Sequence, residues 1–120
     1  MKISTLAACG ALLLATAAAH AADVNDAQIA AIVVTANQVD VDAGKLAAAT
    51  TANAEVKKLA ELMVTDHTAV NKSATELVTR LGVTPEDNPT AQSLAADGTK
   101  HVAYLHTLHG AAFDLSLIHI

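Results

Sequence analysis

The sequence predicts an all-α protein folded as an antiparallel helical bundle. Apolar or small residues recur at intervals of three and four over three long segments, which is the pattern of amphipathic helices. Only short breaks separate these segments, and helices joined by short connections pack antiparallel. The stretch Val39–Asp42 alternates as a strand does, but it is too short to overturn a helical pattern that continues on both sides.

The first two helices have clear boundaries. The first is predicted over Asp26–Thr50, where Asn25 or Asp26 can cap the free N–H groups of its first turn. The second begins after Asn53, which is also a favourable capping residue, and ends at Gly82, because glycine adopts the left-handed conformation that terminates helices.

The pattern that predicts the third helix is weaker. The helical spacing of its apolar residues runs from about Thr90 to His109, after a proline-containing loop at 84–89. We expect Gly98 to interrupt it and Gly110 to end it, since glycine is a poor residue for helix interiors.

The N-terminus predicts export. A basic start at Met1-Lys2 precedes an apolar run centred on 10–15, and Ala19-His20-Ala21 has the small residues that signal peptidase recognises. We expect residues 1–21 to be removed, by cleavage after Ala21 or one residue later, and the protein to be periplasmic or secreted. The stretch Leu6–Cys9 also matches a lipoprotein cleavage box, but it leaves almost no hydrophobic segment before the cysteine.

Composition excludes several function classes. Without the signal, the chain has no cysteine, and therefore no disulfide and no thiolate ligand or nucleophile. It keeps twelve acidic residues, with one Phe, one Tyr and no basic cluster, so we expect no nucleic-acid binding. No phosphate loop, nucleophile elbow or second apolar run of membrane-spanning length is present. Nothing in the chain favours an enzyme.

Two polar residues interrupt the predicted inward faces. Asp40 lies in the apolar stripe of the first helix, and His67 lies in that of the second, with Asp66 at its edge. If the hairpin turns near Ala52, Asp40 and His67 differ in depth by about one helical turn. Carboxylates and histidines on facing helices form metal sites in bundle cores, with ligands suited to Fe, Mn or Zn. A structural hydrogen-bonded pair is the alternative, since a buried Asp needs a partner.

The histidines of the third helix have less to support them as ligands. His101 and His109 are two turns apart, at about 12 Å, which is too far to chelate one ion. His106 and His109 are spaced to share an ion at the surface, but the rest of a coordination shell is missing.

Three segments resemble a known family. The stretches "ANQVDVDAGKLA", "VKKLAELMVTDHTAVN" and "GAAFD" are similar to a bacterial family of exported helical proteins of unknown function, predicted to be ferritin-like and often labelled as outer membrane proteins. Relatives usually carry Glu where this chain has Asp40 and Asp42. The resemblance adds Asp114 to the candidate metal ligands Asp40, Asp66 and His67. It marks these motif positions: Asp40, Asp42, Asp66, His67, Phe113 and Asp114.

The last six residues, Leu115–Ile120, stand apart. The sequence LSLIHI matches the translation of a transposon-end adapter used in preparing sequencing libraries, and an abrupt apolar run is a poor terminus for a soluble domain. We therefore expect the bundle domain to comprise 22–114, to continue naturally past Asp114, and to lack its C-terminal helix here.

Two functions remain open. The first is an exported structural or envelope-stress interaction module without enzymatic activity, with an envelope protein or a second copy as partner. The second is a ferritin-like metal-binding protein in which Asp40, Asp66, His67 and Asp114 supply part of the site.

Overall fold

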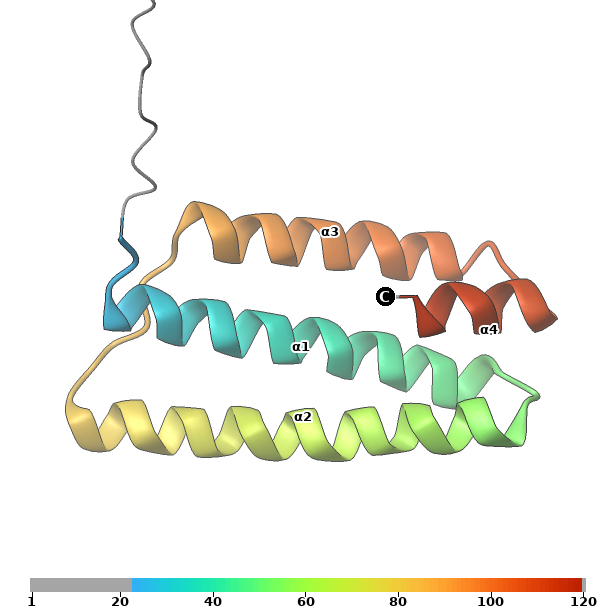
Figure 1. Ribbon diagram of the computed structural model, residues 1–120, viewed down its shortest axis with the longest axis horizontal. Helices are drawn as coiled ribbons and strands as arrows, with labels where there is room; N and C mark the ends of the chain where they lie inside the picture. The colour runs from blue at the N-terminus through green and yellow to red at the C-terminus, as the bar shows by residue number, and fades with distance from the viewer. Residues whose placement is uncertain (1–22, 120) are drawn as a thin grey trace, which may run out of the picture.

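The computed structural model describes residues 23–119, and this part of the chain is all-helical, as predicted. Its elements are connected by short turns and by one longer loop at 82–88 (Figure 1). The four helices are α1 (Asp26–Thr50), α2 (Ala54–Leu81), α3 (Pro89–Leu105) and α4 (Gly110–Ile118).

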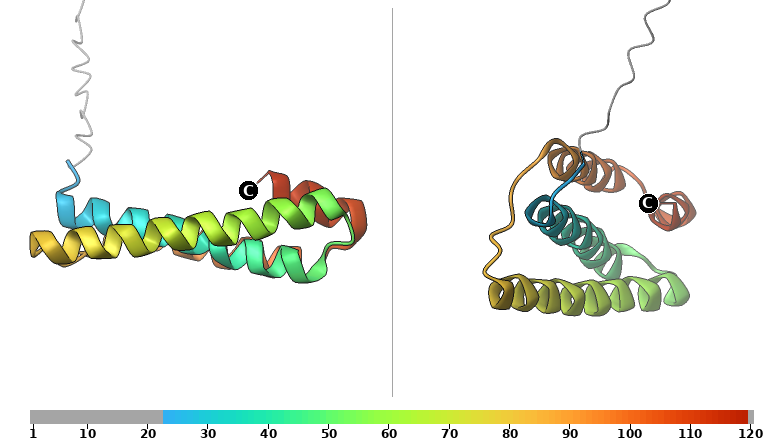
Figure 2. Two further views of the ribbon diagram at one scale, coloured as in Figure 1. Left: turned by 90° about the horizontal axis from the view of Figure 1, so that it is seen from below. Right: turned by 60° about the vertical axis from the view of Figure 1, so that its left-hand side comes forward.

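Helix α1 is the central element of the bundle. It packs along its length against α2 on one side and α3 on the other, and consecutive helices run in opposite directions (Figures 1 and 2). The short α4 folds back beside α3 and makes its main contacts with α1 and α3 (Figure 2). None of the helices in the described residues has the length and apolarity required to cross a membrane.

The helix ends follow the predicted capping chemistry. Asn25 and Gln28 form a capping box at the start of α1, and Asn53 accepts hydrogen bonds from two backbone N–H groups of α2. Gly82 ends α2 with φ +67°, a conformation that costs glycine little. Asn88 caps α3, is buried, and also donates a hydrogen bond to the carbonyl of Gln28 in α1.

The prediction for the third helix was wrong in two respects. The helix ends at Leu105, and residues 106–109 form the turn into α4. Gly98 does not interrupt it: the residue is buried within α3, where a Cβ atom would lie 2.6 Å and 2.7 Å from the two methyl groups of Val39. Its missing side chain lets α3 approach α1 closely, and this packing outweighs the low helix propensity of glycine.

The core is concentrated at one end of the bundle. Phe113 and Leu117 of α4 are almost fully buried with Leu105 of α3, over the small residues Ala43 and Ala47 of α1. At the opposite end, several large apolar side chains stay exposed: Ile29 and Val33 of α1, and Val70, Leu77 and Leu81 of α2.

The helix α4 includes part of the unusual C-terminal sequence. Residues 115–118 continue the helix, with Leu117 buried and Leu115 and Ile118 exposed. The prediction that this sequence derives from an adapter is not addressed by its conformation. The predicted signal peptide at 1–21 lies outside the described residues.

We predict that Gly98→Ala destabilises the bundle, because the added methyl group overlaps Val39. Overpacking costs about 1–3 kcal/mol, partly offset by about 1 kcal/mol of helix propensity. Urea unfolding followed by circular dichroism should therefore show a loss in the unfolding free energy. In the Val39→Ala background the same substitution should be neutral or stabilising. An equal loss in both backgrounds would contradict the close approach of α1 and α3.

Candidate functional site

The polar site predicted between the first two helices forms around His67. Asn37 and Asp40 lie one turn apart on α1, and both face His67 of α2. The Nδ1 atom of His67 is 2.6 Å from Oδ1 of Asn37 and 3.5 Å from Oδ2 of Asp40. About a third of the side chain is exposed in both residues, 35% for His67 and 32% for Asp40, so the site is open to solvent.

The hydrogen bonds of Asn37 define the tautomer of His67. The Nδ2 group of Asn37 donates to the carbonyl of Val33 at 2.8 Å, and this directs Oδ1 toward the imidazole. An amide oxygen only accepts hydrogen bonds, so the imidazole Nδ1 carries the proton and donates. The neutral ring therefore keeps the lone pair on Nε2. Asp40, at 3.5 Å, is beyond a good hydrogen bond from the same nitrogen.

The four predicted metal ligands are not gathered in one place. Asp66 is exposed on α2, although His67 follows it directly. Asp114 accepts a 2.6 Å hydrogen bond from the hydroxyl of Thr51, eleven residues beyond Asp40 and therefore about 16 Å further along the axis of α1. Within residues 23–119, no group of three or more His, Cys, Asp or Glu side chains is placed to hold a metal ion.

The pair that does form fits a structural role better than chelation. A metal held by Nδ1 of His67 together with Asp40 would displace the short hydrogen bond to Asn37. The lone pair on Nε2 remains for a ligand or a partner. Sequence reasoning missed Asn37, although its position three residues before Asp40 on the same face of the helix was a usable signal.

The other histidines are separate from this site. His101 is partly buried in α3, and its Nε2 atom has no hydrogen-bond partner among the described residues. His106 and His109 are exposed in and after the turn that ends α3, so they no longer share a helix face. Helical spacing therefore does not bring these two histidines together.

An apolar groove of about 280 Å³ runs along α1 and α2 at the end of the bundle away from α4. Its side chains are exposed although they are large: 44% for Ile29, 46% for Leu77 and 66% for Leu81. We call this surface the open groove. It is lined by Asp26, Ile29, Ala30, Val33, Val34, Ala74, Leu77, Val78, Leu81 and Val83.

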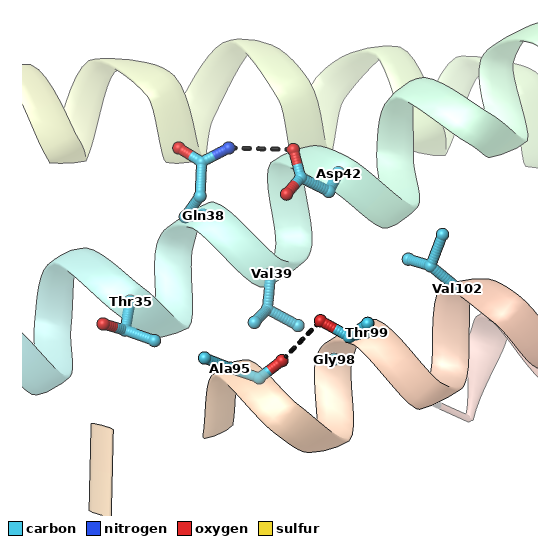
Figure 3. A pocket seen from close by; sticks show the side chains of 8 residues that line it. All are labelled: Thr35, Gln38, Val39, Asp42, Ala95, Gly98, Thr99 and Val102. Carbon is cyan, nitrogen blue, oxygen red and sulfur yellow. Dashed lines mark hydrogen bonds between the residues drawn. The ribbon is translucent and has the colours of Figure 1, made fainter. Parts of the chain in front are cut away.

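A second pocket, of about 380 Å³, lies between α1 and α3 (Figure 3). Its floor contains Val39 and Gly98, the residues at the close helix contact. On its rim, Gln38 donates a 2.8 Å hydrogen bond to Asp42, and Thr99 donates to the carbonyl of Ala95 (Figure 3). These groups bond within their own helices, which leaves little polar chemistry directed into the pocket.

Comparison with known proteins gives a family and nothing more specific. A family model described as "Domain of unknown function (DUF4142)" matches residues 11–119. No curated protein and no solved structure matches the chain. The predicted resemblance to an uncharacterised family is confirmed, while the ferritin-like relationship and the outer membrane label stay predictions.

We predict that neutral His67 is protonated at Nδ1. Long-range ¹⁵N–¹H correlation spectra should show a pyrrole-type shift for Nδ1 and a pyridine-type shift for Nε2. The Asn37→Ala variant removes the acceptor and should shift the ring toward the Nε2-protonated form, which free histidine prefers. A wild-type ring protonated at Nε2 would rule out the proposed Asn37–His67 hydrogen bond.

Proposed function

This chain belongs to the DUF4142 family, whose function is not known, and from its geometry we propose an exported, non-enzymatic module that binds another protein in the cell envelope. Export is supported by the basic start, apolar run and Ala-x-Ala pattern of residues 1–21. A role in binding rather than catalysis is supported by the polar site, where His67 is held by an amide instead of a catalytic partner.

The open groove is the observation that carries this proposal. Contiguous apolar surfaces of this kind on folded proteins mark binding sites, whereas scattered apolar residues do not. Ile29 and Val33 of α1 face Leu77 and Leu81 of α2 across the groove, so the apolar surface spans two helices. Covering these side chains would contribute about 25 cal/mol per Å² of apolar area.

The other end of the same helix shows how such a surface can be covered. There, α4 lies on α1, and Phe113 and Leu117 are about 1% exposed. Helix-in-groove binding of this type is a common mode of recognition between chains. We therefore propose that the partner contributes a helix to the open groove.

We predict that a photo-reactive phenylalanine analogue at Leu77 of the full chain, exported in cells, forms an adduct with one defined partner. The same analogue at Glu76, whose side chain is 63% exposed on the adjacent helix position, is the matched control. The adduct should be absent there and should also be lost when Val33→Glu charges the opposite wall of the groove.

Mass spectrometry of the adduct identifies the partner and the N-terminus of the exported chain, expected at Ala22 or Asp23. Equal adducts at both positions, or none at Leu77, would contradict a binding groove. If residues 1–21 are still present in the adduct, the proposed export with cleavage is wrong, but the proposed binding at the groove is not affected.

Metal binding is the second candidate, and the contact between Asp40 and His67 is the observation that favours it. Nδ1 of His67 on α2 and Oδ2 of Asp40 on α1 are 3.5 Å apart in a polar site that is open to solvent. These two groups could supply about half of the ligands of a metal ion. Any metal would need further ligands from water or from another chain, since the described residues supply no third group.

We predict which substitutions should affect metal binding if the Asp40–His67 pair holds a metal ion. If Fe(II), Mn(II) or Zn(II) binds this site in calorimetric titrations, His67→Ala and Asp40→Ala should each abolish binding. Asp66→Ala and Asp114→Ala should leave it unchanged, because Asp66 is exposed and Asp114 bonds Thr51. Absence of binding by the wild-type chain, or equal loss in all four variants, would exclude a site made by the Asp40–His67 pair.

A further inference from the structure

The pocket between α1 and α3 lies on the face of these helices that points away from α4. Around the axis of α1, at about 100° per residue, the pocket residues Thr35 and Asp42 lie on one side of Val39. Ala43, which is buried in the same cluster as Phe113 of α4, lies on the other side of Val39. The pocket is therefore not part of the surface that α4 covers, and a longer α4 would not close it.

The floor of this pocket is apolar because the two helices meet closely there. Val39 of α1 points toward Gly98 of α3, and Ala95 and Val102 of α3 line the floor on either side (Figure 3). The lining residues of α1 span 35–42, which is about 10 Å along the helix axis. The volume of about 380 Å³ lies within the range of small-molecule sites, which are mostly apolar and contain a few polar groups. A short aliphatic chain therefore fits the floor.

The polar groups on the rim retain mainly hydrogen-bond acceptors. Nε2 of Gln38 donates to Oδ1 of Asp42 at 2.8 Å, which holds the carboxylate at the edge of the pocket without neutralising its charge (Figure 3). Oδ2 of Asp42 receives no hydrogen bond from residues 23–119. The hydroxyl of Thr99 donates to the carbonyl of Ala95, so its oxygen is left to accept from a ligand. Since none of the residues that line the pocket is basic, a ligand that supplies donors and positive charge matches the rim best.

We propose that this pocket binds a primary alkylamine, with the alkyl chain on the apolar floor and the ammonium group beside Asp42. An ammonium group has three donors and no acceptor, which complements the acceptors of the rim. The formal net charge of −5 on the chain also attracts cations and repels carboxylates. One carboxylate matches one positive charge, so a diamine of the same length would place its second ammonium group on the apolar floor at a cost. The site goes beyond the proposed function, because it does not require a partner in the open groove.

The test compares n-hexylamine with n-hexanol and hexanoate, which share the alkyl chain and differ in charge. Titration of the full chain at neutral pH, followed by ¹H–¹⁵N correlation spectra, should give the tightest binding for hexylamine and the weakest for hexanoate. The amide shifts should change within 35–42 and 95–102, where the lining residues lie. Asp42→Asn should weaken hexylamine several-fold, up to about tenfold, because the carboxylate is exposed and its charge is partly screened. It should leave hexanol unaffected, and Asp66→Asn, at an exposed carboxylate of α2, should leave both unaffected.

A second variant tests the floor independently of the charge. Ala95→Leu fills part of the pocket from an exposed position of α3, so it should weaken hexylamine and hexanol alike. Equal binding of the three probes, or an Asp42→Asn variant that binds hexylamine as the wild type does, would overturn the proposed amine site. Shift changes centred on Leu77 would do the same, since they would place the probe in the open groove. Circular dichroism of each variant confirms that it is folded.

Discussion

The close packing of α1 against its neighbours is the constraint on which this structure depends. It requires small residues where the helices meet. A Cβ atom on Gly44 would lie 3.0 Å from the carbonyl oxygen of Ala60, and one on Gly98 would overlap Val39. Since α2 and α3 pack against α1 rather than against each other, these contacts hold both helices in place. The alanine-rich composition, which offers little apolar volume per residue, is thereby compensated by short distances between backbones.

The same packing explains why a polar site is tolerated between α1 and α2. Nδ1 of His67 is hydrogen-bonded to Oδ1 of Asn37, and Nδ2 of Asn37 donates to the carbonyl of Val33. Because these polar groups have partners, burying them partly between the helices costs little free energy. A little further along, the Nδ2 group of Asn71 donates a hydrogen bond to the carbonyl of Val34 across the interface, while its buried Oδ1 atom has no hydrogen-bond partner among the described residues. The bundle is therefore joined by apolar contacts near α4 and by amide hydrogen bonds toward the open groove.

Local sequence signals predicted the fold well and the site in part. The bounds of α1 and α2 follow from caps at Asn25, Asn53 and Gly82, whose effects act within one helical turn. The prediction that Gly98 interrupts the third helix was wrong because this glycine leaves space for Val39 of α1, and no local sequence pattern reveals a contact between helices. Asp40 and His67 were found because each interrupts an apolar stripe. Asp114 could not be placed, since its partner Thr51 is 63 residues away in the chain.

The uneven core has a consequence for motion along α1. The helix is continuous, but its C-terminal half is anchored by Phe113 and Leu117, while its first turns border exposed side chains. The free energy of local opening should therefore decrease from Ala47 toward Ile29, and backbone amides should exchange with solvent progressively faster in that direction. A helix bound in the groove would raise the stability of the weaker half. Because α1 contacts both α2 and α3, binding at one end would make the whole three-helix layer more rigid.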